Sequence, residues 1–165
     1  MRRQTNGAGN LQASPFDIGY VGGCLDCDGC ITITRVQPRK RRPRGRFIPV
    51  IQFQNTNSEF IEGLHTIFDR YGVGHWIGWR PQRGLGQKPV GVLHIQGLKR
   101  VARFLSVFGI CAKAKRKQLQ LLAEYVDVRL RRPPKTPPDN YDVEMWIEIG
   151  RLNGRAPETI RGASC

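Results

Sequence analysis

Apolar residues recur along the chain at two spacings, which predict which segments are helices and which are strands. Ile18, Val21 and Leu25 follow one another at intervals of three and four residues, as on one face of a helix. Segment 31–36 alternates apolar and polar residues, which is typical of a half-buried strand. These patterns predict helices over 14–28, 57–71, 98–108, 113–128 and 140–152, and strands over 31–36, 47–53, 75–79 and 90–96.

The predicted order of elements is αββαββα with extra C-terminal helices, an α+β class. Loops rich in Pro, Gly and Arg separate the elements, and the chain contains no internal repeat. With 165 residues the chain is long enough for one domain with a sizeable core. We expect a disordered basic arm over 1–12, a single domain over 13–154 and a flexible tail over 155–165.

The first predicted helix has a well-formed start and a second face almost without side chains. Ser14 is a good N-cap, Pro15 suits the first helical position, and Asp17 lies three residues past the cap. The second face carries Gly19, Gly22, Gly23 and Asp26. Each glycine within a helix costs about 0.5–1 kcal/mol relative to alanine. The glycine face therefore predicts close approach by another backbone.

Asp28 stands at the C-terminal end of this helix, where a carboxylate opposes the helix macrodipole. Its position predicts a neighbouring cation. Two such helices in contact along their glycines would bring two carboxylates side by side and form a site for divalent metal ions. The alternative is an aspartate that only begins a turn with Gly29.

Segment Val21–Gly29 resembles the LAGLIDADG signature, with Asp26-Cys27-Asp28-Gly29 in the place of its D-x-D-G end. It departs from the signature by Val for the first Leu, Gly for Ala, and Cys at two positions. The segment occurs once, so the chain resembles the single-motif homing endonucleases, which work as homodimers. The resemblance implies a four-stranded antiparallel sheet that forms a saddle over double-stranded DNA.

The same resemblance implies the residues of a catalytic site. Asp28 matches the acid that binds the catalytic Mg²⁺ (with Mn²⁺ as a substitute), assisted by the backbone carbonyl of Cys27. Asn55 matches a polar residue near the attacking water, with Asn57 as the alternative if the register differs. Lys115, in the segment Lys113-Ala114-Lys115-Arg116-Lys117-Gln118, matches the lysine near the scissile phosphate. A turn asparagine and a solvated basic turn are the plainer interpretations. Homodimer contacts are implied for Gly19, Gly22, Gly23 and Asp26, with Asp26 bonding backbone amides.

The charge of the chain favours a nucleic-acid partner. Its 20 Arg and 7 Lys exceed 13 acidic residues and give a net charge of +14. Counting by twos along the strands predicts that Thr32, Thr34, Arg46 and Gln52 face the DNA bases. For backbone contacts we expect Arg35, Arg39, Lys40, Arg41, Arg80, Arg83, His94, Lys113 and Lys117. Of Trp76 and Trp79, we expect one in the core and the other exposed.

The cysteines and the hydropathy argue against three further classes of protein: disulfide-stabilised, metal-cluster-binding and membrane-spanning. Five cysteines are an odd number, so a disulfide framework is not expected, and Cys24, Cys27 and Cys30 are better explained as small residues than as metal-cluster ligands. No segment is apolar enough to predict a membrane span or a signal peptide.

Three functions fit the sequence. The first is a site-specific homodimeric DNA endonuclease that makes a metal-dependent, staggered double-strand break in a long pseudo-palindromic target. The second is an RNA-binding intron maturase of the same family, and the third is a basic structural RNA-binding protein. Asp28, Asn55 and Lys115 together favour the endonuclease, because a maturase requires none of them.

Overall fold

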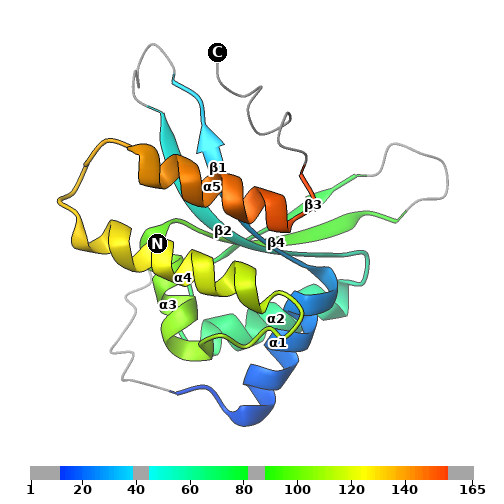
Figure 1. The fold of residues 1–165 in the computed structure, drawn as a ribbon. Coiled ribbons are helices and arrows are strands. Elements are labelled where there is room, and N and C mark those ends of the chain that lie inside the picture. Colours follow the sequence, from blue (N-terminus) through cyan, green and yellow to red (C-terminus); the bar gives the residue numbers. More distant parts are fainter. Residues whose placement is uncertain (1–11, 39–44, 82–87, 156–165) are drawn as a thin grey trace, which may run out of the picture.

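The computed structural model describes residues 12–38, 45–81 and 88–155, which form five helices and a four-stranded sheet (Figure 1). This confirms the predicted α+β class and the αββαββα order with extra C-terminal helices. The elements in chain order are α1 (Pro15–Asp28), β1 (Gly29–Val36), β2 (Arg46–Asn55), α2 (Ser58–Arg70), β3 (Trp76–Arg80), β4 (Val90–Gln96), α3 (Leu98–Phe108), α4 (Arg116–Arg131) and α5 (Asn140–Leu152).

The four strands are antiparallel and lie in the order β1-β2-β4-β3. Residues directly opposite each other in an antiparallel pair share a face of the sheet. One face carries the fully buried side chains of Ile31, Ile51, Phe53, Leu93 and Ile95. These pack with the buried residues of the helices into one apolar core.

The other face of the sheet is turned away from this core. The register places residues of all four strands on this open face, ending on β3 with Trp76 and Arg80. The side chains on it are Cys30, Thr32, Thr34, Val36, Arg46, Ile48, Val50, Gln52, Gln54, Val90, Val92, His94, Gln96, Trp76 and Arg80. Most are polar, positively charged or half-buried, so the sheet presents one apolar face and one face suited to an aqueous partner.

Helix α1 begins as its sequence predicts and is fixed at this end by a buried carboxylate. The Ser14 side chain accepts a hydrogen bond from the Asp17 amide across 3.1 Å. The Asp17 carboxylate in turn accepts from the Tyr71 hydroxyl at 2.7 Å and from Arg70 at 3.3 Å. These contacts join the start of α1 to the end of α2.

Two local expectations differ from the structure. Trp76 and Trp79 lie on opposite faces of β3, yet both are exposed, at 58% and 46%. Helix α4 begins at Arg116 rather than at residue 113, and the amides of Lys113 and Lys115 just before it donate to the side chain of Asp26. Among the described residues, no helix is long and apolar enough to cross a membrane.

Candidate functional site

The predicted residues Asp28 and Asn55 meet at one end of the sheet. Asp28 is the last residue of α1, and Asn55 is the last residue of β2. The Asn55 side-chain amide donates a hydrogen bond to Asp28 Oδ2 across 3.0 Å. Two residues that lie 27 positions apart in the sequence are therefore held together, and the exposed carboxylate of Asp28 has a fixed orientation.

Asn55 is itself fixed by the start of the next helix. Its Oδ1 accepts from the Asn57 amide at 2.8 Å. Asn57, the alternative to Asn55 as a catalytic residue, is the N-cap of α2 and accepts from the Glu59 amide at 2.9 Å. The structure thus places Asn55 beside Asp28 and gives Asn57 a capping role.

Lys115 binds the same end of α1. Its ammonium group donates to the carbonyl oxygens of Leu25 at 2.8 Å and of Gly29 at 2.6 Å. A positive charge is favourable at a helix C-terminus, and the Leu25 carbonyl belongs to the last turn of α1. The ammonium group has three N–H donors, so one remains after these two contacts with described residues.

Asp26 holds the segment that carries Lys115. Its two carboxylate oxygens accept from the amides of Lys113, at 2.8 Å, and of Lys115, at 3.0 Å. Burial acts to raise the pKa of Asp26, but the amides of Lys115, Lys113 and Ala114 and the charge of Lys115 outweigh it and hold the pKa below its usual value. Asp26 bonds backbone amides as expected, and these amides belong to its own chain.

The donor set at the end of α1 suits a hard divalent cation. Asp28 and Cys27 are both exposed, so this helix end presents a carboxylate to an ion, with the Cys27 backbone carbonyl next to it in the chain. Mg²⁺ prefers such oxygen ligands, retains several waters and is commonly held by one or two carboxylates together with phosphate oxygens. One chain supplies only part of such a set.

The open face of the sheet carries the predicted base-reading residues. Thr32, Thr34, Arg46 and Gln52 all lie on it, in the predicted strand phase. Gln52 is opposite His94, and His94 is opposite Trp76, so these three side chains form a row across the sheet. Burial, together with the neighbouring charge of Arg80, lowers the pKa of His94, so the His94 ring is neutral at pH 7.

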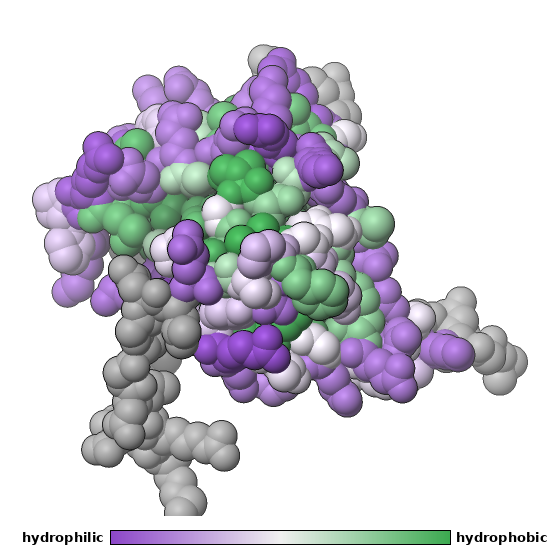
Figure 2. Space-filling view, turned by 90° about the horizontal axis from the view of Figure 1, so that it is seen from below, coloured by the Kyte–Doolittle hydropathy of each residue, from purple (hydrophilic) through white to green (hydrophobic). Residues whose placement is uncertain are grey.

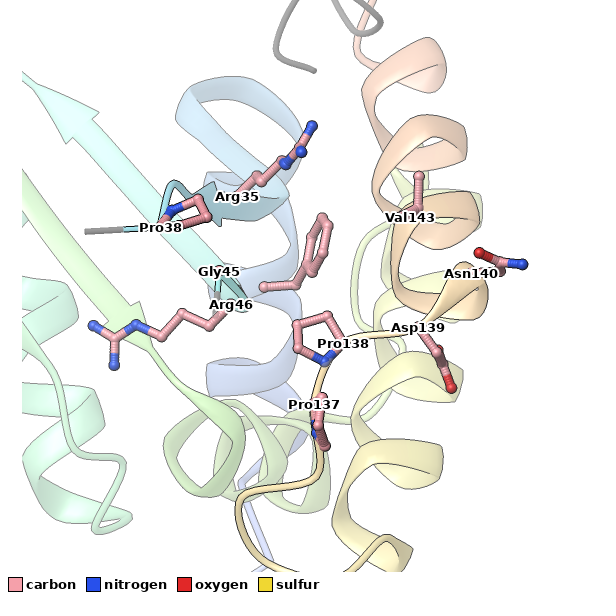
Figure 3. A pocket seen from close by; sticks show the side chains of 10 residues that line it. Arg35, Pro38, Gly45, Arg46, Pro137, Pro138, Asp139, Asn140 and Val143 are labelled. Carbon is pink, nitrogen blue, oxygen red and sulfur yellow. The ribbon is translucent and has the colours of Figure 1, made fainter. Parts of the chain in front are cut away.

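The Arg35 side chain does not point toward the predicted contact with the DNA backbone. It lies on the core face of β1, and its guanidinium group stacks over the Trp146 ring of α5, 5.5 Å from the centroid. Figure 3 shows Arg35 on the side of α5, whereas Arg46 extends away from it. Both line a hollow of about 590 Å³ between the β1–β2 strands and the start of α5, remote from Asp28. A contact of Arg35 with the DNA backbone would therefore require its side chain to move away from the Trp146 ring.

The remaining predicted DNA contacts divide into two groups. Lys113 and Lys117 are exposed and flank Lys115, and Arg80 is exposed at the end of β3. Arg39, Lys40, Arg41 and Arg83 lie outside the described residues. Two contacts were not foreseen: Arg155, assigned to the tail, donates to the Thr32 hydroxyl at 3.4 Å, and Asn153 donates to the Ile31 carbonyl at 2.8 Å. No spacing in the sequence indicates that the end of α5 meets β1.

The glycines expected at a dimer contact lie on two different sides of α1. Gly19 and Gly23 are exposed, and a Cβ atom at either would meet nothing within 4 Å. Gly22 is buried, and a Cβ there would lie 2.3 Å from the carbonyl oxygen of Cys111 in the same chain. The close backbone approach predicted for Gly22 is therefore present, but it is intramolecular.

The exposed side of α1 combines glycines with large apolar residues. Phe16 is 79% exposed and its ring stacks on that of Tyr20, with centroids 6.5 Å apart. Each of these positions lies three or four residues from another member of the set, so they form one stripe, here called the α1 stripe: Phe16, Gly19, Tyr20, Gly23 and Cys27. Figure 2, seen from the side to which the start of α1 points, shows apolar and neutral surface in the middle of a hydrophilic rim.

The cysteines of α1 and β1 do not converge. Cys24 is buried, Cys27 is exposed and Cys30 lies on the open face of the sheet. Burial raises the pKa of the Cys24 thiol and raises that of the Cys111 thiol to about 11, so both are neutral at pH 7. Among the described residues, the one group of three metal-ligating side chains that lie close together contains no cysteine.

Comparison with known proteins identifies the fold. No protein-family model and no curated protein sequence matches the chain. The homing endonuclease I-CvuI, in complex with a DNA target in the presence of Mg, is 17% identical with a TM-score of 0.63, and the match covers 89% of this chain and 91% of that one. The homing endonuclease I-TnaI is 14% identical with a TM-score of 0.58, and the match covers 92% and 96% of the two chains.

A third similar structure is about twice as long. The meganuclease I-SmaMI, bound to uncleavable DNA, is 12% identical with a TM-score of 0.65. The match covers 92% of this chain but only 49% of I-SmaMI, so the chain spans about half the length of that protein. These similarities show that the chain has the LAGLIDADG homing endonuclease fold.

Proposed function

We propose that the protein is a site-specific DNA endonuclease that binds double-stranded DNA as a homodimer and cuts both strands with divalent metal ions. The observation that carries this proposal is the Asn55–Asp28 hydrogen bond beside Lys115. It places an oriented carboxylate, a polar amide and a lysine at the end of α1, next to one end of the open sheet face.

The open face and the charge of the chain support DNA as the partner. The net charge of +14 favours a polyanion, and Arg46 at the start of β2 and Arg80 at the end of β3 both lie on the open face. Gln52 suits adenine and Arg46 suits guanine in the major groove, while Thr32 and Thr34 add short hydroxyl donors. I-CvuI, a homing endonuclease, and I-SmaMI, a meganuclease, were both solved with DNA, which agrees with this assignment.

The α1 stripe supports a homodimer. It is the exposed apolar side of the helix that ends in Asp28, and its glycines permit close approach of a second helix backbone. A two-fold contact along the stripe would bring two copies of Asp28 close together. Two nearby carboxylates repel each other unless cations lie between them, so dimerisation and metal binding favour each other.

The residues of the site have separate roles in this proposal. Asp28 holds the ion, Asn55 orients Asp28 and the water near it, and Lys115 stabilises negative charge on the phosphate with its remaining N–H. Bound Mg²⁺ supplies water activation and charge neutralisation at the leaving oxygen. Mn²⁺ is expected to substitute, because it accepts the same oxygen ligands.

The test is cleavage of a library of randomised DNA sites by the purified protein with Mg²⁺. A metal-dependent double-strand break in a subset of related, near-palindromic sequences supports the proposal. Tight binding of a structured intron RNA without cleavage of any DNA would instead indicate the maturase function. Sequence-independent RNA binding alone would indicate the basic structural protein.

A further inference from the structure

A second cluster of metal-ligating side chains lies away from Asp28, where α2 turns into β3. It consists of His65 and Asp69 on α2 and His75 just before β3. One ligand atom of each residue lies within 4.8 Å of the ligand atoms of the other two. His65 and Asp69 are four positions apart and therefore project from the same side of the helix. Asp69 Oδ2 lies 3.7 Å from His65 Nε2, the ring nitrogen that does not face His75.

The contacts that fix the His75 ring are typical of a metal-ligating histidine. Its Nδ1 lies 2.7 Å from the Val73 carbonyl oxygen, and its ring packs edge-on against the buried ring of Phe68. A carbonyl oxygen only accepts, so Nδ1 carries a proton and Nε2 is the nitrogen that can present a lone pair to an ion. A backbone carbonyl that fixes the tautomer in this way is a usual outer partner of a metal ligand.

The lone pair of His75 is directed at the second histidine. His75 Nε2 and His65 Nδ1 are 2.7 Å apart, so a proton or a cation must lie between the two nitrogens. Two imidazole nitrogens on one tetrahedral zinc ion, each at 2.0–2.1 Å, are about 3.3 Å apart. A ring movement of roughly half an ångström is sufficient, and the half-buried His65 ring has solvent on one side.

We propose that His65, Asp69 and His75 form a zinc site that clamps the turn between α2 and β3. Two imidazole nitrogens and one carboxylate suit Zn²⁺, with water as the fourth ligand. Mg²⁺ does not fill this site, because it prefers oxygen ligands only. The ion would tie the helix that Asn57 caps to the strand that carries Trp76 and Arg80.

The experiment is a titration of the chelator-treated full-length protein with Zn²⁺, and with Co²⁺ as a spectroscopic probe. We expect one ion per chain in the presence of excess Mg²⁺, visible Co²⁺ bands without thiolate charge transfer, and a higher midpoint of thermal unfolding. His65→Gln, His75→Gln and Asp69→Asn should each weaken binding by more than about tenfold. His94→Gln is the matched control, since it alters the third histidine of the chain and should leave the affinity unchanged.

The site is disproved if Zn²⁺ does not bind, if the His65→Gln variant binds like the wild type, or if Co²⁺ shows thiolate charge transfer, which would place the ion on cysteines. His75 packs on Phe68, so the His75 variant is first checked for folding by circular dichroism. If it unfolds, the more exposed His65 and Asp69 variants decide the question. Zinc affinity is measured without DNA, so the result is independent of the proposed nuclease activity.

Discussion

Asn55 donates a hydrogen bond to Asp28 across 3.0 Å and so joins the last residue of β2 to the last residue of α1. This contact fixes one oxygen of an exposed carboxylate at the C-terminal end of a helix. The helix macrodipole disfavours a negative charge there. Asp28 is therefore placed at an electrostatic cost that a bound cation would offset.

The first prediction concerns this carboxylate. Asp28→Asn should abolish Mg²⁺-dependent cleavage and leave specific DNA binding intact, because the substitution removes a ligand charge and changes little shape. Asp127→Asn is the control, since Asp127 is exposed on α4 and pairs only with Arg131 among the described residues. Cleavage by the Asp28→Asn protein at near the wild-type rate would remove Asp28 from the metal site.

The second prediction concerns Asp26, which accepts from the amides of Lys113 and Lys115. Asp26→Ala leaves both amides without this partner and should lower the free energy of unfolding by about 1–3 kcal/mol. It should also slow single-turnover cleavage while affecting the affinity for DNA less, because Lys115 loses its fixed position. Equal losses of affinity and rate would show that Asp26 acts on DNA binding instead.

The third prediction separates the glycines of α1. Gly22→Ala should destabilise the monomer at any protein concentration, because its Cβ would lie 2.3 Å from the Cys111 carbonyl oxygen. Gly23→Leu should leave the monomer fold intact, since that position faces open space, but should prevent a close helix–helix contact. Chemical denaturation and analytical ultracentrifugation distinguish the two effects. A Gly23→Leu protein that remains dimeric and active would exclude the α1 stripe as the interface.

These variants also show what the sequence alone was able to predict. Helical spacing places Gly19, Gly22, Gly23 and Asp26 on one stripe, but it does not identify the neighbour that covers each residue. The segment around Cys111 and Lys113 lies nearly 90 positions away in sequence and covers Gly22 and Asp26. That contact depends on the tertiary fold. The sequence therefore predicted that these residues share one face of the helix, but not that Gly22 is covered by the same chain while Gly19 and Gly23 are exposed.

The elements themselves were predicted more closely than the contacts between them. Helices α3 and α5 have the predicted bounds, because Gly97 and Gly109, both with positive φ, flank α3 and an Asp139 capping box starts α5. The strand phase was also predicted, since Thr32 and Thr34 lie on the open face. Arg35 was assigned from its nearness to the basic loop, although its phase places it on the core face. His65 and His75 were missed, because ten residues and a turn separate them.

The fourth prediction concerns acid stability. The hydroxyl of Tyr71 lowers the pKa of Asp17 below 3.8; burial opposes this effect, and Ser14 and Arg70 reinforce it. A carboxyl group whose pKa is lower in the folded state stabilises the protein fully above pH 3.8 and loses this contribution as the pH falls through the folded pKa. Asp17→Asn should therefore be less stable than the wild type at pH 7. Urea unfolding should show this difference shrinking below pH 3.8, and a difference independent of pH would contradict the assignment.

The last prediction distinguishes base reading from backbone contact on the proposed DNA interface. Gln52 lies on the open face in a row with His94 and Trp76, whereas Lys113 and Lys117 flank Lys115. Gln52→Ala should change the preferred base at particular target positions, at a cost of about 1–3 kcal/mol per lost bidentate contact. Replacing Lys113 and Lys117 by Ala should instead weaken binding to all sequences and reduce the slope of log K against log salt by about 0.9 per lost phosphate contact. Selection of cleaved sites from a random library, with affinities measured at several salt concentrations, separates these effects. If the Lys variant shifts the base preference and the Gln52 variant does not, the open face of the sheet is not the surface that reads the bases.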